Sequence, residues 1–262
     1  MNGANGYSYL GQQTSGEENQ VTFYNSICFV LNDEERAKLG KEPLDANGDG
    51  TVTIDELAGK DVIRQGQTSG AGYLYPSFFL SNLKNQANRD IWMSKDYAKI
   101  ITDTKTLNEK GMTFVEGNAD ASKGQIHGVN TDGGYDAAFN QVMSGGADAA
   151  FGFMDIRYTQ GYSKSTSDYY QDKDLFKKTQ TVCMTTPIYN DTISYRTNLD
   201  AKTVETVKNA FISASKDGSK DEEGTGAYLL YKIYSHTGYK TASKEDYADE
   251  VEMYKWKVAN GI

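Results

Sequence analysis

The chain has 262 residues, enough to bury a sizeable core as one two-lobed domain or as two small domains. Its net charge of -9 and pI near 4.8 argue against a nucleic-acid partner, because such proteins present basic surfaces. No apolar run reaches the roughly 18 residues of a membrane-spanning helix, and the first six residues lack the basic and apolar regions of a signal peptide.

Strand-type and helix-type apolar patterns alternate along the chain, which predicts an α/β fold. Strands are expected at 21–31, 62–64, 112–115, 147–153, 181–184 and 193–195. Helices are expected at 73–83 and 135–143, after Asp200 with an apolar face of Val204, Val207 and Phe211, and from Ser243 with a face of Tyr247, Val251, Tyr254 and Val258. Segments 158–173 and 215–226 are polar loops.

Two cysteines, Cys28 and Cys183, lie in strand-like runs about 155 residues apart and have no zinc-type spacing. Two readings stay open. They are either buried thiols that act as small apolar residues or the two halves of a disulfide.

Residues 45–56, DANGDGTVTIDE, match the calcium loop of an EF-hand. Oxygen side chains stand at loop positions 1, 3 and 5, glycine at 6 and glutamate at 12. The pattern predicts a structural Ca²⁺ ion held by Asp45, Asn47, Asp49, Thr51 (through its carbonyl) and Glu56. The alternative is an acidic turn before a capped helix.

A glycine- and hydroxyl-rich segment, GQTSGAG at 66–72, follows the strand at 62–64 and directly precedes a helix. Glycines permit a tight turn, and the amide groups and positive dipole of the helix start then converge on one point. The segment predicts an oxyanion site. The alternative is a turn capped by Ser69.

The chain resembles the phosphate/phosphite/phosphonate-binding proteins of ABC importers. The resemblance rests on seven segments in the family's order: FYNSICFV (23–30), ELAGKDV (56–62), QTSGAGY (67–73), GYDAA (134–138), ADAAFGFMD (147–155), PIYND (187–191) and IYSHTGY (233–239). It covers nearly the whole chain apart from insertions at 34–52 and 85–108. The calcium-like loop departs from the family pattern.

The resemblance implies a periplasmic-binding-protein fold of the second type, with two α/β lobes joined by crossover strands near 24–30 and 181–188. Lobe one would comprise 1–26 and 186–262, and lobe two 27–185. Family members carry an export signal and about two β-α units before the position of Met1, so we expect lobe one to be incomplete here. Cys28 and Cys183 would lie side by side on the two crossovers.

The family's ligand-binding residues correspond to Tyr7, Gln67, Thr68, Ser69, Gly70, Tyr135, Asp155 and Asp191. Tyr135 stands where the family often has histidine, and it keeps a hydrogen-bond donor. The resemblance implies transport without catalysis, a membrane permease as partner, and an extracytoplasmic location with an anchor absent from this chain.

The paired carboxylates Asp155 and Asp191 bear on the ligand. Two unit charges about 4 Å apart interact by about 4 kcal/mol at an effective dielectric of 20, so two free carboxylates would oppose a bare dianion. The sequence therefore favours an aminoalkylphosphonate, whose ammonium would meet both. A monoprotonated phosphite or hydrogen phosphate is the second choice.

Two other classes are weighed against this interpretation. One is a calcium-bearing extracellular carbohydrate-binding or adhesion module, which 19 tyrosines would suit. The other is a hydrolase of phosphate esters. Neither His127 nor His236 stands near a serine motif of nucleophilic catalysis, which disfavours the hydrolase.

Overall fold

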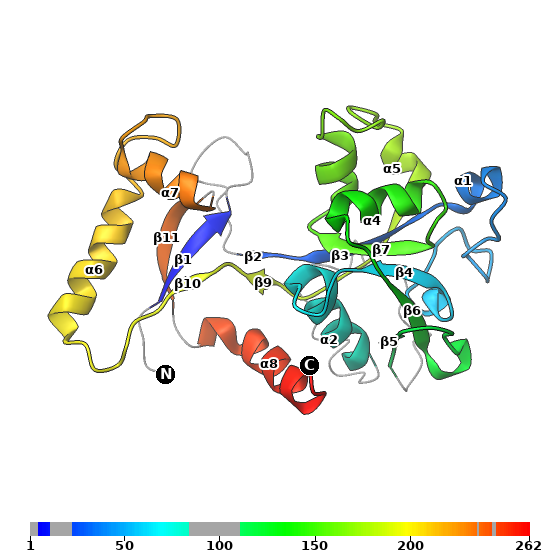
Figure 1. The fold of residues 1–262 in the computed structure, drawn as a ribbon, viewed down its shortest axis with the longest axis horizontal. Helices are drawn as coiled ribbons and strands as arrows, with labels where there is room; N and C mark the ends of the chain where they lie inside the picture. The colour runs from blue at the N-terminus through cyan, green and yellow to red at the C-terminus, as the bar shows by residue number, and fades with distance from the viewer. Residues whose placement is uncertain (1–4, 11–22, 84–110, 235, 243–244) are drawn as a thin grey trace. The chain divides into compact units, whose positions relative to one another are not determined.

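The computed structural model describes residues 5–10, 23–83, 111–234, 236–242 and 245–262 (Figure 1). The chain divides into two compact units. Unit 1 comprises 1–24 and 187–254, and unit 2 comprises 25–186 and 255–262. The predicted α/β class is confirmed by the alternation of helices and strands.

Unit 2 contains a six-stranded sheet with helices on both of its faces. Its strands are β3 (Ser26–Leu31), β4 (Asp61–Arg64), β5 (Thr113–Val115), β6 (Gln125–Asn130), β7 (Ala149–Phe153) and β8 (Thr179–Met184). Its helices and helical turns are α1 (Asp33–Lys38), η2 (Asp55–Leu57), η3 (Gly70–Leu74), α2 (Tyr75–Asn82), η5 (Ala121–Lys123), α4 (Gly134–Met143), η6 (Arg157–Tyr162) and α5 (Leu175–Lys178).

The strand order is β5-β6-β4-β7-β3-β8. Strands β5, β6, β4 and β7 run parallel, and β3 is antiparallel to both of its neighbours, so β8 runs in the same direction as those four. The carboxyl ends of five strands therefore share one edge of the sheet, which we call the carboxyl edge. In open α/β sheets this edge is where ligands bind.

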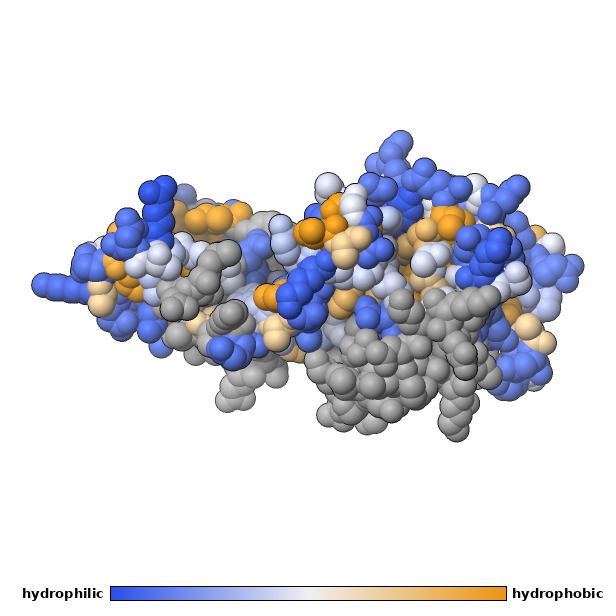
Figure 2. Space-filling view, turned by 90° about the horizontal axis from the view of Figure 1, so that it is seen from below, coloured by the Kyte–Doolittle hydropathy of each residue, from blue (hydrophilic) through white to orange (hydrophobic). Residues whose placement is uncertain are grey.

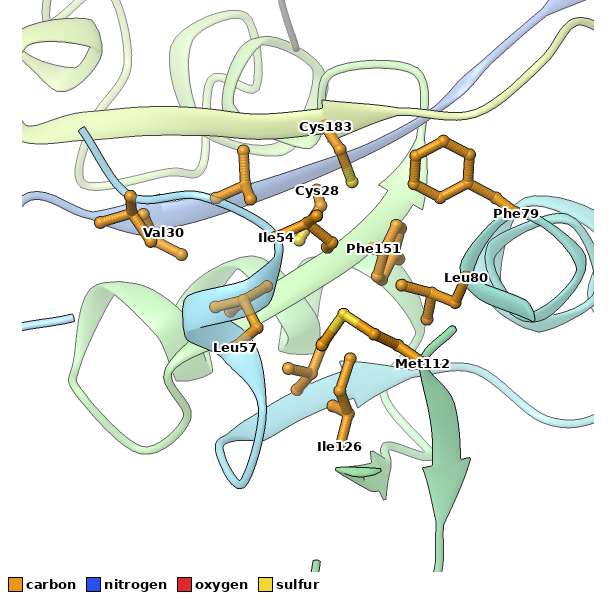
Figure 3. Close-up of a cluster of buried hydrophobic side chains, with 14 of the residues drawn as sticks. Cys28, Val30, Ile54, Leu57, Phe79, Leu80, Met112, Ile126, Phe151 and Cys183 are labelled. Carbon is orange, nitrogen blue, oxygen red and sulfur yellow. The ribbon is translucent and has the colours of Figure 1, made fainter. Parts of the chain in front are cut away.

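The core of unit 2 lies in two layers, because successive side chains of a strand point to opposite faces. Val62 packs with Phe79 and Leu80 of α2, whereas Ile63 packs with Phe139 of α4. Figure 3 shows the first layer around Phe151. The sheet is thus covered by α2 on one face and by α4 on the other.

Cys28 and Cys183 lie in this first layer, opposite each other in the β3–β8 register (Figure 3). The predicted proximity is confirmed. Both thiols are free and fully buried. Burial raises the pKa of the Cys28 thiol well above its ordinary value, and the neighbouring Cys183 adds to the shift. These thiols act as apolar core groups.

Unit 1 has an antiparallel sheet of order β10-β1-β11 and a separate antiparallel pair, β2-β9. These strands are β1 (Asn5–Leu10), β2 (Phe23–Tyr24), β9 (Ile188–Tyr189), β10 (Thr192–Ile193) and β11 (His236–Ala242). The helices of unit 1 are α6 (Ala201–Ala214), α7 (Gly226–Tyr234) and η7 (Glu245–Tyr247), and α8 (Ala248–Ala259) begins there. Asp200 caps α6 as predicted, since its Oδ1 accepts from Thr203 N at 2.9 Å.

The last helix differs from the sequence prediction in the side chains that it buries. Its end, residues 255–262, clusters with unit 2, where the Trp256 ring lies 5.8 Å from that of Phe78. The expected apolar face is exposed instead, with Val251, Tyr254 and Val258 at 39%, 63% and 60%. Ser243, its expected cap, lies outside the described residues.

Several elements lie outside the helices and strands expected from the sequence, among them β6, β11 and α5. His127 lies in β6, and His236 begins β11. The expected strand at 21–31 is interrupted at Asn25. The expected loop 158–173 overlaps the helical turn η6.

The surface is largely hydrophilic, in line with a mean hydropathy of -0.64. On the face shown in Figure 2, hydrophilic residues surround scattered hydrophobic ones. Of the helices in the described ranges, none combines the length and apolar character that a membrane crossing requires.

Candidate functional site

The carboxyl edge of unit 2 brings together residues from three parts of the sequence. The 66–72 segment follows β4, Tyr135 opens α4 after β6, and Asp155 follows β7. Strands β6 and β7 both pair with β4, so these three loops are neighbours. The predicted anion segment therefore lies at the position in the sheet where α/β proteins bind ligands.

Ser69 is the cap of the helical turn η3. Its Oγ accepts from Gly72 N at 3.1 Å, and its carbonyl accepts from Tyr73 N and Leu74 N at 3.1 and 2.9 Å. A hydroxyl that accepts one hydrogen bond still has a proton to donate. The amides of Gly70 and Ala71 belong to the first helical turn and so have no acceptor inside the helix. The N-terminal end of η3 and α2 thus offers donors to an anion.

Gly72 is required by the close approach of the two sides of this turn. A Cβ there would lie 2.4 Å from Gln65 Cβ and 2.8 Å from Ser69 Oγ. The backbone also closes here, since Gln65 N donates to Gly72 O at 3.0 Å. Gln67 and Thr68, at the tip of the turn, are exposed and open to a ligand.

Tyr135 lies beside the turn, with its hydroxyl 3.4 Å from Ser69 Oγ. Its ring is 6.5 Å from that of Phe153 at the end of β7. Burial raises the pKa of Tyr135 above its ordinary value, so the phenol stays protonated and able to donate near neutral pH. The structure therefore brings Ser69 and Tyr135 together, as the site prediction requires.

The hydroxyl of Ser26 ties the turn to the neighbouring strands. Ser26 is fully buried, and its Oγ donates to Ala71 O at 2.6 Å. The backbone of Ser26 also forms an isolated β-bridge with Met154, the residue before Asp155. Met154 has a φ of 55°, a left-handed conformation that is costly for a residue with a side chain and that occurs at functional sites. This turn leads the chain out of β7 into Asp155.

The Asp155 carboxylate is paired within unit 2. Arg157 Nη2 lies 2.7 Å from Asp155 Oδ2, and Arg157 Nε donates to Asp155 Oδ1 at 2.9 Å. The charge argument from the sequence takes this carboxylate as uncompensated, because Arg157 is not part of that argument. The spacing Asp-Ile-Arg was the only available signal, and spacing alone does not show that two side chains meet.

The other two predicted ligand residues, Tyr7 and Asp191, belong to unit 1. Tyr7 lies in β1, opposite Lys240 of β11, and Asp191 is exposed just after β9. Their roles in ligand binding stay predictions.

In the calcium-like loop, carboxylate oxygens that are expected to bind the metal accept hydrogen bonds from backbone amides of the same loop. Asp45 Oδ1 accepts from Gly48 N at 2.8 Å and Oδ2 from Gly50 N at 2.7 Å. Glu56 accepts from Ala46 N and Thr53 N, both at 2.7 Å.

The contacts of this loop leave the predicted calcium site untested. Across the described ranges, no group of three or more His, Cys, Asp or Glu side chains is placed to hold a metal ion. Calcium binding to Asp45, Asn47, Asp49, Thr51 and Glu56 therefore stays a prediction.

The two α/β units and the donor-rich carboxyl edge define the class as a type II periplasmic binding protein. A family model described as "ABC transporter, phosphonate, periplasmic substrate-binding protein" matches residues 3–247. The chain belongs to this family, whose members bind small phosphonates outside the cytoplasm and work with an ABC permease as transport proteins, not enzymes.

Two solved structures of one protein show the same fold. XAC2383 from Xanthomonas citri bound to chloride ion is 14% identical, with a TM-score of 0.55, 98% of this chain covered and 73% of that chain. The same protein bound to ATP is 15% identical, with a TM-score of 0.51 and coverages of 95% and 70%. PhnD1 from Prochlorococcus marinus (MIT 9301) in complex with methylphosphonate is 13% identical, with a TM-score of 0.46 and coverages of 97% and 72%. No curated protein matches the chain.

Proposed function

We propose that this chain is the solute-binding component of an importer for phosphonates or related phosphorus oxyanions. Unit 2 would hold the phosphorus oxygens through Gln67, Thr68, Ser69 and the Gly70 amide, with Tyr135 donating beside them. The observation that carries the proposal is Ser69, whose Oγ accepts from Gly72 N and lies 3.4 Å from the Tyr135 hydroxyl at the carboxyl edge.

The acidic net charge does not oppose this function. Backbone amides and hydroxyls supply the local positive potential at a helix N-terminus, so a protein of charge -9 can still bind a small anion. Hydrogen bonds to a charged group are worth about 1.5–3 kcal/mol each.

The preference for an aminoalkylphosphonate has lost part of its basis. It assumed two free carboxylates, and Arg157 neutralises one of them, Asp155. Asp191 in unit 1 remains as a candidate partner for an ammonium. Selectivity for the amine therefore stays a prediction, and a monoprotonated phosphite, phosphate or simple phosphonate is an equal candidate.

Calorimetric titration of the full chain tests the proposal. The ligands are 2-aminoethylphosphonate, methylphosphonate, phosphite, phosphate and an oligosaccharide panel. Binding of a phosphorus oxyanion supports the proposal. Binding of an oligosaccharide alone would replace it with the carbohydrate-binding alternative.

Docking on a membrane permease and attachment through an anchor outside residues 1–262 are part of the same proposal. Reconstitution with a phosphonate permease in vesicles tests the docking, which should stimulate uptake only when ligand is bound.

A further inference from the structure

The Asp155 carboxylate has its negative charge cancelled by a bidentate partner. Besides the two side-chain contacts, the backbone N–H of Arg157 donates to Asp155 Oδ1 at 3.0 Å. The Arg157 side chain is 10% exposed and that of Asp155 is 26% exposed, so water screens the pair only weakly. The pair therefore presents little net charge to a ligand.

Arg157 is held in place by protein groups rather than by a ligand. Its Nη2 donates to Thr181 Oγ1 at 2.5 Å, and its Nη1 lies 3.4 Å from Thr179 Oγ1. The guanidinium also lies 5.5 Å from the ring centre of Phe176. Three further contacts thus fix the orientation that pairs it with Asp155.

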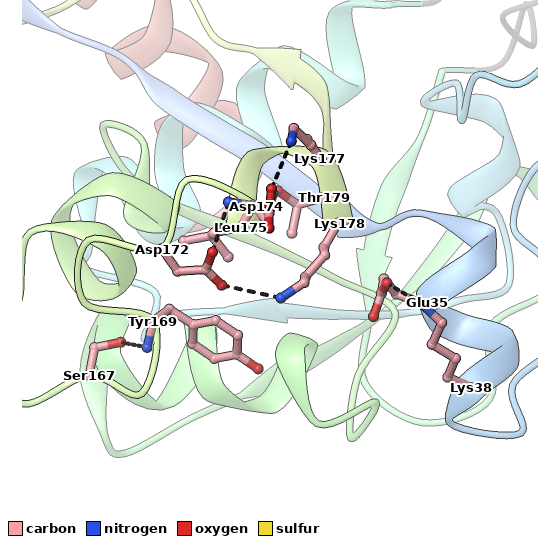
Figure 4. A network of polar contacts seen from close by, with 10 residues as sticks. All are labelled: Glu35, Lys38, Ser167, Tyr169, Asp172, Asp174, Leu175, Lys177, Lys178 and Thr179. Carbon is pink, nitrogen blue, oxygen red and sulfur yellow. Dashed lines mark hydrogen bonds and ion pairs between the residues drawn. The ribbon is translucent and has the colours of Figure 1, made fainter.

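The segment that supplies these contacts is itself fixed by polar contacts (Figure 4). Thr179 Oγ1 donates to Leu175 O at 2.8 Å. Lys178 pairs with Asp172 at 3.2 Å, and Lys177 with Asp174 at 2.8 Å. The residues that hold the Arg157 side chain are therefore held in place by contacts within unit 2.

Other carboxylates at the carboxyl edge also have their own cations. Glu116, which follows β5, pairs with Arg64 at 2.9 Å. Asp136, in the first turn of α4, pairs with Lys164 at 2.7 Å. Among the described residues of this edge, Asp132 is the remaining carboxylate, and it is exposed. Both of these carboxylates are more exposed than Asp155, with Glu116 at 79% and Asp136 at 48%, so water screens their charges more strongly.

We propose that Arg157 is a specificity-determining residue of the phosphonate site. By neutralising Asp155, it lets unit 2 accept a phosphonate that has no ammonium group. This inference rests on the proposed function. Without Arg157, Asp155 would be a free carboxylate, which repels an anion and attracts a ligand cation.

The test measures the affinity ratio of methylphosphonate to 2-aminoethylphosphonate by calorimetry on the full chain. The variants are Arg157→Met, Asp155→Asn and the double variant. Asp148→Asn is a matched control, because Asp148 precedes the same strand β7 at its other end and pairs with buried Arg36 at 2.8 Å. Its carboxylate is 22% exposed, close to the value for Asp155.

We expect Arg157→Met to shift the ratio toward 2-aminoethylphosphonate by about tenfold or more, a change of about 1.4 kcal/mol. The double variant, which removes both charges, should return the ratio to within about threefold of wild type. Asp148→Asn should leave the ratio unchanged. A merely structural role of Arg157 would weaken both ligands equally, which would overturn the proposal.

Removing one partner of a buried ion pair lowers the stability of the fold, and Arg157→Met could therefore fail to fold. The variant Asp155→Asn provides a second test. Asp155→Asn leaves the guanidinium without its carboxylate and should tighten methylphosphonate binding. A weakening of methylphosphonate by Asp155→Asn would overturn the proposal. If wild type binds no phosphorus oxyanion, the proposed function fails instead, and the two failures are thereby distinguished.

Discussion

Replacing Ser69 with alanine removes two interactions of different kinds. The first is the cap, in which Ser69 Oγ accepts from Gly72 N at 3.1 Å. Loss of a serine cap costs about 0.5–2 kcal/mol of stability. The second is the hydroxyl proton that we propose to donate to the ligand, and a hydrogen bond to a charged group is worth about 1.5–3 kcal/mol.

The expected result is a loss of methylphosphonate affinity by about ten- to a hundredfold, since each 1.4 kcal/mol is tenfold. The double variant Thr68→Ala with Ser69→Ala should lose several kcal/mol of methylphosphonate binding free energy. Calorimetry measures the affinity, and urea unfolding of the full chain measures the stability.

Asn32→Ala is the matched control for the cap. Asn32 caps α1 in the same unit, and its Oδ1 accepts from Glu35 N at 2.9 Å. This cap lies at the end of β3, which is antiparallel to β7, and so at the opposite edge of the sheet. Asn32→Ala should lower stability without changing affinity. An affinity of Ser69→Ala within about threefold of wild type, in a folded protein, would refute the assignment of Ser69 to the ligand.

Four further predictions follow from particular side chains. Tyr135→Phe should weaken methylphosphonate binding by about 0.5–1.5 kcal/mol in calorimetry, and unchanged affinity would exclude its hydroxyl from the site. Calcium should bind the 45–56 loop at about 10⁻⁴–10⁻³ M and, at a hundredfold excess, add about 2.7 kcal/mol of stability that Glu56→Gln abolishes. If a terbium titration shows no change in fluorescence and chelator does not change the melting temperature, the calcium prediction is wrong and the loop is only a turn. Burial lowers the pKa of His236, so the unfolded chain binds more protons as the pH falls through the ordinary value, and stability is lost on acidification. Urea unfolding across this range should show a flatter profile for His236→Gln. Cys28 and Cys183 should resist alkylation in the native protein and react in denaturant, and mass spectrometry without reductant that finds a disulfide would contradict free thiols.

The turn that we propose as the anion site could be predicted from the sequence, because the pattern that indicates it is local. Glycines around Thr68 and Ser69, after a short apolar run and before a helical pattern, fix a strand, a tight turn and a helix start. The structure places this turn after β4, with Gly72 at the point where no side chain fits. The adjacency of Cys28 and Cys183 followed from the resemblance rather than from spacing.

The pairing of Asp155 with Arg157 could not be predicted, because it depends on the backbone turn at Met154 and on support from another strand. Thr181 of β8 lies 24 residues from Arg157 in the sequence, so no local pattern indicates that the two side chains are in contact. Tertiary contacts of this kind decide whether a carboxylate is free. The pairing of Asp155 with Arg157 weakens the charge argument for an amine, and Asp191 remains a candidate partner for an ammonium group.

The missed strands have weak patterns. Strand β6 contains Gly128, where a Cβ would lie 2.7 Å from Arg64 Nε, so the glycine serves packing in a strand that propensity disfavours. Strand β11 is rich in polar residues. In α8, the Trp256 ring packs against Phe78 within unit 2, whereas Tyr254 of the expected apolar face is 63% exposed.

The central claim is that a phosphorus oxyanion binds the donors at the start of η3. Titration of the ¹⁵N-labelled full chain with methylphosphonate, followed by amide NMR, tests it most directly. The account predicts that the Gly70 and Ala71 amide signals shift downfield and saturate with the calorimetric affinity. Saturable binding that leaves both of these signals unmoved would contradict it.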